Sequence, residues 1–175
     1  MLDAKKPWLS IYGDKLTGEP LGGSLTEFLE EAVEKYRDNT ALTRGEQKIS
    51  YGELLDLTES FAAALYEARV QKGDRVGLML PNCPEYVIAF FGTMRIGATV
   101  TQVNPIYVGR ELTHIFNNSS TETLIVHSMM YEKAKDIQVD TPLKRIICVG
   151  EPEGGLKDGD VPFGEFFAGR CGKRA

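Results

Sequence analysis

The stretch of residues 73–112, GDRVGLMLPNCPEYVIAFFGTMRIGATVTQVNPIYVGREL, constrains the fold more than any other part of the chain. Its first apolar run, RVGLML, ends at Pro81 and predicts a buried strand. Pro84 can open a helix because the first helical position needs no amide hydrogen, and Gly97 can end that helix in a left-handed cap. Residues 98–103 predict a second strand, so the stretch indicates a βαβ unit with adjacent parallel strands.

The helix of this unit carries two rows of large apolar residues at helical spacing, Tyr86, Phe90 and Met94 in one and Val87 and Phe91 in the other. We expect these rows to form the buried face of the helix. On this assignment, Phe90→Ala leaves a core cavity and lowers the free energy of unfolding by about 3–5 kcal/mol. A loss below about 1 kcal/mol would show that the face is assigned wrongly.

Strand and helix signals alternate on both sides of the central unit. Ser24 and Ser50 each have a glutamate three residues later, and such capping boxes predict the start of a helix. Further elements are expected as a hairpin over 40–44 and 47–50, helices over 110–117 and 129–137, and strands over 122–127 and 144–149. This order predicts an α/β fold with an open, mostly parallel sheet and helices on both faces.

Composition shifts divide the chain into three parts. Residues 1–23 contain prolines and glycines and are expected to form an extended arm. Residues 24–150 are expected to form an α/β subdomain. Residues 151–175, which begin with EPEGGLKDGDVP, are expected to be a loop or linker to a downstream region, with one helical turn over 163–167.

Charge and cysteine content exclude several classes of protein. The net charge is −5 and the lysines and arginines are scattered, which argues against a nucleic-acid partner. Three cysteines without CxxC spacing indicate reduced thiols in a cytoplasmic protein. The first ten residues lack the apolar core of a signal peptide. Arg95 interrupts the longest apolar stretch, so no transmembrane segment is expected.

The residues with chemical potential do not form a catalytic constellation. No GxxxxGK[ST] or GxGxxG motif is present, and Gly154-Gly155 with Lys157 lacks the strand and helix that a phosphate loop needs. His114 and His127 have no third ligand at metal spacing, so no metal site is predicted. Cys83 precedes a helix N-terminus, which can lower a thiol pKa, but a small residue in a tight turn is the simpler interpretation.

A ligand cleft is expected at the carboxyl ends of the strands, where open parallel sheets bind ligands. The segments 81–83 and 104–107 lie there in the predicted topology. Asn104, Tyr107 and Arg110 are the candidate substrate-binding residues, since a ring can stack and a cation can pair with an anion. The alternative is that these residues serve turn geometry and solvent exposure.

Four motifs, ISYGEL at 49–54, GDRV, LPNCPEY and NPIY followed by REL, occur in an order and spacing that resemble the N-terminal region of the AMP-forming acyl-CoA synthetases. The resemblance to these adenylate-forming ligases extends to about residue 149. NPIY followed by REL is similar to the fatty-acyl and aryl-acid branch, and a long-chain fatty-acid–CoA ligase is the parent that we expect. Peptide-synthetase adenylation domains more usually carry a DP-type ending at this point.

The resemblance implies a reaction in which a fatty or aryl carboxylic acid and Mg–ATP form an acyl-adenylate, whose acyl group then passes to coenzyme A. The family's phosphate loop, nucleotide contacts and catalytic lysine lie downstream of the matched region. No catalytic residue is therefore assigned here, and the 175-residue chain alone is expected to be inactive and to bind no ATP, Mg²⁺ or coenzyme A. A homodimer formed through the arm and a location at the membrane periphery are further expectations from the family.

Two other hypotheses remain open. The chain can be a free-standing, non-catalytic α/β module for assembly or regulation that is related to the synthetases. It can also be a flavodoxin-like binding domain for another nucleotide, although the missing phosphate loop speaks against this.

Overall fold

The structure is a computed structural model that describes residues 22–169. The predicted arm lies almost entirely outside the described residues, as does the dimer contact expected from it. The helices are α2 (Leu25–Tyr36), α3 (Tyr51–Glu67), α4 (Pro84–Arg95), α5 (Gly109–Ser119), α6 (Tyr131–Gln138), α7 (Phe163–Phe166) and the 3₁₀ turn η2 (Ser128–Met130). The strands are β1 (Thr40–Arg44), β2 (Gln47–Ser50), β3 (Arg75–Met79), β4 (Thr99–Gln102), β5 (Thr123–His127), β6 (Arg145–Val149) and β7 (Val161–Pro162).

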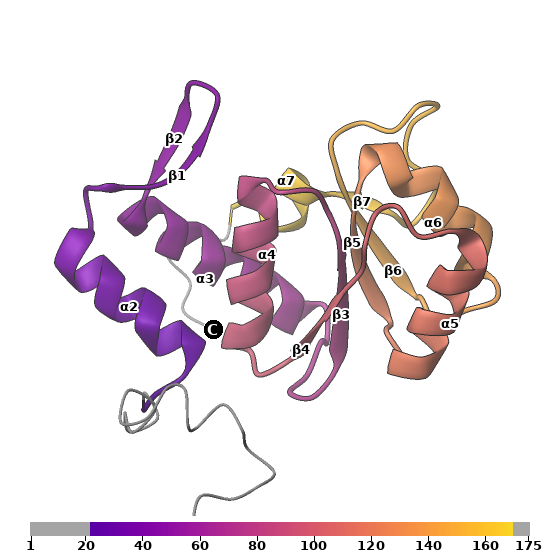
Figure 1. Cartoon of the computed structure of the whole chain (residues 1–175), viewed down its shortest axis with the longest axis horizontal. Coiled ribbons are helices and arrows are strands. Elements are labelled where there is room, and N and C mark those ends of the chain that lie inside the picture. Colours follow the sequence, from indigo (N-terminus) through magenta and orange to yellow (C-terminus); the bar gives the residue numbers. More distant parts are fainter. Residues whose placement is uncertain (1–21, 170–175) are drawn as a thin grey trace, which may run out of the picture.

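The central sheet is parallel throughout and has the strand order β4-β3-β5-β6-β7 (Figure 1). Strands β3 and β4 flank α4 in sequence, which confirms the predicted βαβ unit. The connection through α4 places β4 on one side of β3, whereas the connection through α5 returns across β3 to β5. These two crossovers leave the sheet on opposite faces, so the fold is doubly wound.

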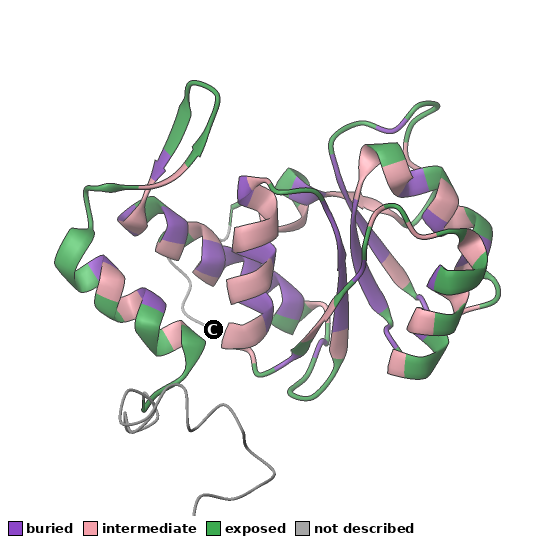
Figure 2. Cartoon of the chain, viewed as in Figure 1, coloured by how far each residue is buried: buried purple, intermediate pink, exposed green. Residues whose placement is uncertain are grey.

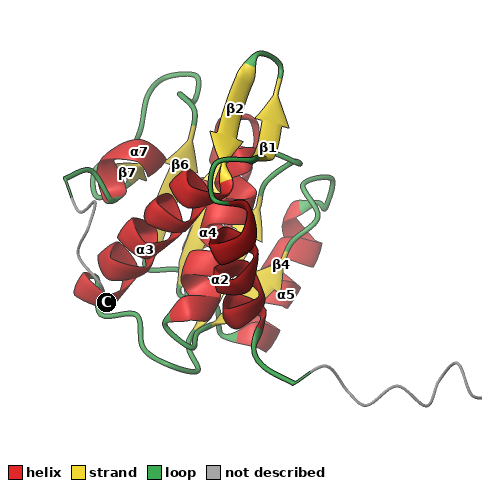
Figure 3. Ribbon diagram, turned by 90° about the vertical axis from the view of Figure 1, so that its left-hand side faces the viewer, coloured by secondary structure: helices red, strands yellow, loops and turns green. Residues whose placement is uncertain are grey.

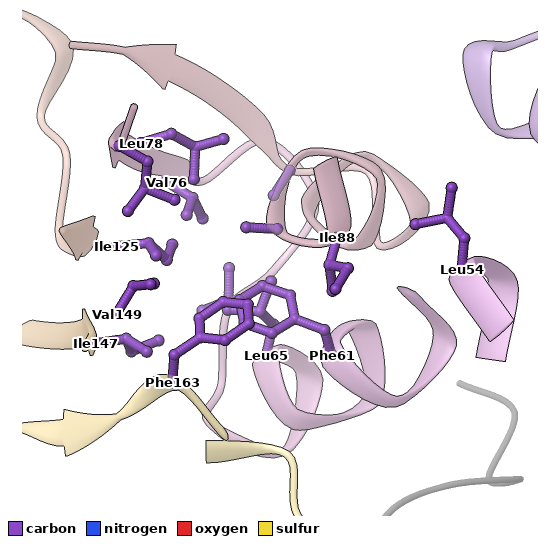
Figure 4. Packing of buried hydrophobic residues seen from close by; sticks show 14 of the residues in the cluster. Leu54, Phe61, Leu65, Val76, Leu78, Ile88, Ile125, Ile147, Val149 and Phe163 are labelled. Atoms are coloured by element: carbon purple, nitrogen blue, oxygen red, sulfur yellow. The ribbon is translucent and has the colours of Figure 1, made fainter. Parts of the chain in front are cut away.

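Each face of the sheet is covered by its own apolar cluster. Alternate residues of the buried strands point to opposite faces, as the period of a strand requires. Figure 3 shows α2, α3, α4 and α7 together on one side of the sheet, with Phe61 and Leu65 of α3 buried in the cluster (Figure 4). Helices α5 and α6 cover the other face over Leu124 and Val126. The open sheet with helices on both faces is confirmed.

Helix boundaries follow the predicted capping residues. The backbone N–H of Glu53 donates to Ser50 Oγ (3.2 Å) while Ser50 N–H donates to Glu53 Oε2 (2.7 Å), a complete capping box at the start of α3. Ser24 and Glu27 form the equivalent box at α2. Pro84 occupies the first turn of α4, and Gly97 follows it with φ of +73°.

The predicted buried face of α4 is wrong. The residues that α4 buries are Pro84, Ile88, Ala89, Gly92 and Thr93, whereas the two rows of large apolar residues are only partly buried. The physical reason is the closeness of α3. A Cβ added at Gly92 would lie 2.8 Å from Phe61 Cδ1 and 3.2 Å from the Thr58 carbonyl oxygen, so the face that contains Gly92 is the one that lies against α3.

The region beyond Gly150, expected as a loop or linker, contains two further elements. Strand β7 pairs with β6 through Val161 and Pro162, although it has only two residues. The helical turn predicted over 163–167 is confirmed as α7, and Phe163 is buried beside Phe61 with a centroid distance of 5.1 Å. Residues 161–166 therefore add an edge strand to the sheet and the side chain of Phe163 to the hydrophobic core.

Candidate functional site

The loops that follow β3, β4 and β5 leave the sheet at its carboxyl edge. The loop after β4 leaves the edge strand and crosses the carboxyl end of β3 before it enters α5 on the other face of the sheet. Val103 N–H donates to the Leu78 carbonyl (3.0 Å), which holds the start of this loop against β3. The ammonium of Lys133 donates to the carbonyls of Pro105 (3.4 Å) and Tyr107 (3.0 Å), which fixes its middle.

Asn104 shapes this loop with its own side chain. Its Oδ1 accepts a hydrogen bond from the Ile106 N–H (3.1 Å), and its carbonyl accepts one from the Tyr107 N–H (3.1 Å). A side-chain oxygen bonded to the backbone two residues ahead is an Asx turn, which suits the residue before a proline. The structure thus gives Asn104 a turn-forming contact, the alternative considered for this position.

Tyr107 and Arg110 come together at a surface hollow of about 570 Å³ that Glu111, His114 and Ile115 also line. Tyr107 is partly buried against the α5–α6 cluster, and Arg110 is exposed. Glu111 accepts a hydrogen bond from the Val108 N–H (3.0 Å) and so caps α5, whereas Arg110 makes no hydrogen bond or ion pair within residues 22–169. The hollow offers an aromatic ring and an unpaired cation to an anionic ligand.

The sequence analysis did not predict three exposed apolar residues in the loops at this edge of the sheet. Ile106 is 79% exposed, Val108 58% and Met129 79%, and all three follow the ends of β4 or β5. Large apolar side chains in loops at strand ends, here in PIYV and SMM, were the available signal. Such residues at the edge of a sheet are typical of a surface that something else covers.

The strand order locates the topological switch point between β3 and β5, whose outgoing connections run to opposite faces of the sheet. Segments 81–83 and 128–130 follow these two strands at the carboxyl edge, and the loop that contains Asn104 and Tyr107 follows β4 at the same edge. The predicted cleft segments therefore lie beside the switch point, and the segment after β5 joins them.

The candidate nucleophiles have no activating environment. Burial raises the pKa of the Cys83 thiol and raises that of Cys148 to about 11, so both thiols are protonated at neutral pH. The Ser119 hydroxyl donates to the Ile115 carbonyl (2.7 Å). His127 Nδ1 accepts a hydrogen bond from the Met129 N–H (3.3 Å), a local contact of the turn after β5.

Within the described part of the chain, no group of three histidine, cysteine, aspartate or glutamate side chains could hold a metal ion. None of the helices over residues 22–169 has the length and apolar character needed to span a bilayer. The site thus supplies shape, one ring and one cation, and it contains no complete catalytic or metal-binding group among these residues.

A family model described as "AMP-binding enzyme" matches residues 29–161. A long-chain-fatty-acid–CoA ligase of Bacillus subtilis is 33% identical over 135 residues, which cover 76% of this chain and 24% of the relative. One of Salmonella typhimurium is 33% identical over 147 residues, which cover 82% of this chain and 26% of the relative. The chain therefore spans about a quarter of the length of these curated relatives.

Solved structures match the fold with similar coverage. A long-chain-fatty-acid–CoA ligase from Archaeoglobus fulgidus has a TM-score of 0.70 and 30% identity over 82% of this chain and 29% of that protein. The anthranilate–CoA ligase AuaEII, solved with anthranoyl-AMP, has a TM-score of 0.79 and 24% identity over 85% of this chain and 28% of that protein. The second match bears on the fold alone.

Proposed function

The chain belongs to the AMP-binding enzyme family, and we propose that it is the N-terminal part of an AMP-forming ligase that joins a fatty acid to coenzyme A. The observation that supports this most strongly is the 33% identity to long-chain-fatty-acid–CoA ligases over 76% and 82% of the chain. The resemblance of NPIY and REL to the fatty-acyl branch points in the same direction.

In the proposed reaction, a carboxylate oxygen of the acid attacks the α-phosphorus of Mg–ATP and displaces pyrophosphate. The sulfur of coenzyme A then attacks the acyl carbonyl and displaces AMP. The described residues offer no activated nucleophile and no metal-binding group, so we assign both steps to the remainder of the enzyme. The part of the chain described here would position the substrate and carry the parallel sheet on which the rest is built.

We assign a substrate-positioning role to Tyr107 and Arg110, with Asn104 shaping the loop that presents them. The unpaired guanidinium and the adjoining ring suit an anionic group of the acid, the nucleotide or coenzyme A. In the full-length enzyme, Arg110→Ala should raise KM for one substrate about tenfold or more with a smaller change in kcat. Arg69→Ala is the control, because Arg69 lies at the amino end of the sheet, beside Arg75 and Arg145.

The first experiment is to sequence the gene past codon 175 and to express the longer protein. Release of AMP is then measured with ATP, coenzyme A and a panel of fatty and aryl acids, with the 175-residue chain as an inactive control. Formation of acyl-CoA from fatty acids supports the proposal. A longer protein that forms no acyl-adenylate from any of these acids contradicts it, and a stop codon after Ala175 would favour the non-catalytic module.

A further inference from the structure

The β4–α5 loop, residues 103–108, carries Tyr107 to the candidate site and leads directly to Arg110 in the first turn of α5. Apart from Val103 its residues are partly buried or exposed, so burial alone does not hold the loop in place (Figure 2). The hydrogen bonds within the loop are the two that Asn104 accepts, and these shape a turn without attaching it to the rest of the protein. The position of the ring and of the guanidinium therefore depends on what ties the loop down from outside.

Lys133 of α6 supplies this tie. Its ammonium donates to the Tyr107 carbonyl (3.0 Å) and to the Pro105 carbonyl (3.4 Å), so one cation holds the backbone on both sides of Ile106. Within residues 22–169, no other group outside the loop forms a hydrogen bond with residues 104–107. Because hydrogen bonds from a charged donor are stronger than those between neutral groups, the loss of this one side chain would free the middle of the loop.

The charge of Lys133 has no other partner in the part of the chain that the structure describes. Lys133 forms no ion pair there, and the neighbouring Glu132 pairs instead with Lys157 (2.8 Å). Yet the Lys133 side chain is partly buried, and an ammonium group leaves water at a cost unless acceptors replace the water. The two loop carbonyls are these acceptors, so Lys133 is not placed like an ordinary solvated lysine.

Helix α6 is a firm base for the tie. Tyr131 is 0% exposed, and its hydroxyl donates to Asp160, which also pairs with Lys135. Farther along the helix, Ile137 lies against the start of α5, since a Cβ added at Gly109 would be 3.3 Å from Ile137 Cγ2. The loop is thus attached to β3 at its start, to α6 at its middle and to α5 at its end, and the middle attachment consists of one side chain.

We propose that Lys133 is a positioning residue of the enzyme, which holds the β4–α5 loop in the conformation that presents Tyr107 and Arg110 to an anionic substrate. Lys133 acts through the loop and does not itself contact the substrate. A loop that is ordered before binding loses less conformational freedom when the substrate arrives, which favours binding. The effect on a substrate rests on the proposed function, whereas the tie between Lys133 and the loop does not.

The tie is tested by amide hydrogen exchange, followed by NMR, in the 175-residue chain, where no enzymatic activity is needed. Lys133→Met removes the charge and keeps the apolar stem of the side chain. We expect the Ile106 and Tyr107 amides to exchange about fivefold faster or more in this variant, and the Thr99 amide at the amino edge of the sheet to change less than about twofold.

Two further variants serve as references for this measurement. Lys133→Arg keeps a charged donor and should leave exchange in the loop within about twofold of the wild type. Lys144→Met is the matched control, since it removes a lysine whose side chain is 71% exposed at the amino edge of the sheet, and it should leave the loop unchanged. If Lys133→Met does not fold, Lys133→Gln takes its place in every measurement.

The effect on the substrate is tested in the full-length enzyme by a double-mutant cycle with Arg110→Ala. Lys133→Met should raise the same KM that Arg110→Ala raises, by about three- to tenfold, with a change in kcat below about twofold, and Lys133→Arg should restore most of the loss. In the Arg110→Ala background, Lys133→Met should add less than about twofold, because a tie has little effect once the group that it positions is gone.

Three results would overturn the proposal. Unchanged exchange in the loop would show that Lys133 does not hold it. An equal rise at Thr99 and in the loop, or a failure of both Lys133→Met and Lys133→Gln to fold, would show that Lys133 serves the whole fold. Effects on KM that multiply in the double variant would show that Lys133 acts independently of Arg110. If the full-length enzyme activates no acid, the proposed function fails, and the exchange rates still decide whether Lys133 holds the loop.

Discussion

Gly92 sets the distance between α3 and α4. A methyl group at this position would lie 2.8 Å from Phe61 Cδ1, and the neighbouring backbone oxygen of Thr58 cannot move aside easily. We therefore expect Gly92→Ala to lower the free energy of unfolding by about 1–3 kcal/mol, even though alanine is the better helix former.

Gly164 of α7 is the control for this substitution. Nothing lies within 4 Å of a Cβ built there, so Gly164→Ala should leave stability unchanged or raise it by up to about 1 kcal/mol. Urea unfolding followed by circular dichroism measures both changes. A Gly92→Ala variant as stable as Gly164→Ala would show that the two helices are not in close contact.

Phe61 and Phe90 differ in burial, although both are helical phenylalanines. Phe61 is 0% exposed and contacts three rings of the α7 region, whereas Phe90 is partly exposed and contacts Tyr86 and Phe91. We expect Phe61→Ala to lower stability by about 3–5 kcal/mol and Phe90→Ala by about 1–2 kcal/mol. Equal losses in urea unfolding would restore the original assignment of the α4 face.

At the scale of elements, one carboxylate fixes the long segment between β6 and β7 to helix α6. Asp160 has a side chain that is 4% exposed, pairs with Lys135 (2.9 Å) and accepts the Tyr131 hydroxyl (2.5 Å). The Tyr131 oxygen in turn accepts the Lys157 N–H (2.8 Å). The short strand β7 follows directly and depends on this anchor, because two residues of pairing contribute little alone.

Removal of this anchor should be strongly destabilising. Asp160→Ala removes the carboxylate that pairs with Lys135, whose side chain is only 14% exposed, and leaves the buried Tyr131 hydroxyl without this acceptor, so we expect a loss of about 3 kcal/mol. Glu122→Ala, which breaks an exposed pair with Lys144 (2.8 Å), should change stability by less than about 1 kcal/mol. If the two variants unfold at the same urea concentration, the Asp160 cluster does not hold the segment.

The same cluster predicts a response to alkaline pH. Burial, together with the hydrogen bond to Asp160, raises the pKa of Tyr131 to about 12 from its usual 10. The folded state therefore favours the protonated hydroxyl, and this contribution is fully present below pH 10 and is lost as the pH rises from 10 to 12.

Tyr131→Phe removes the titrating group and should flatten the fall in unfolding free energy over this pH range. Tyr66→Phe is the control because Tyr66 is 67% exposed. Urea unfolding at pH 8, 10 and 11 measures the difference. An equal slope in wild type and Tyr131→Phe would mean that the hydroxyl ionises freely in the folded protein.

At the scale of the whole molecule, local sequence signals were enough to predict where the helices and strands lie, but not which elements pack against each other. The capping serines, Pro84 and Gly97 act through the backbone beside them, so they could be read in the sequence. The buried face of α4 could not be predicted in this way, because both sides of the helix are apolar and the hydrophobic periodicity favours neither side. The absence of a side chain at Gly92 determines which side of α4 packs against α3, because a Cβ there would clash with Phe61 of that helix.

For the candidate site, the sequence predicted the edge of the sheet on which the residues lie but not which loops lie next to each other there. The order of strands and loops placed Asn104 and Tyr107 at the carboxyl edge of the sheet, where the structure has them. The strand order, which puts β5 beside β3 and so makes the loops after these two strands neighbours, depends on long-range pairing and could not be predicted from the sequence. The contacts that Tyr107 and Arg110 make with a substrate stay a prediction.

The contact of Phe61 with Phe163, Phe166 and Phe167 also has a consequence for the order of events during synthesis. A ribosome makes α3 about 100 residues before it makes these rings, and at about 5–20 residues per second the delay is roughly 5–20 s. Throughout that interval the apolar side of α3 is exposed to water where these three rings will later cover it. The nascent chain therefore exposes the Phe61 side of α3 during this interval, and we expect a chaperone that binds apolar segments to recognise α3 while synthesis continues.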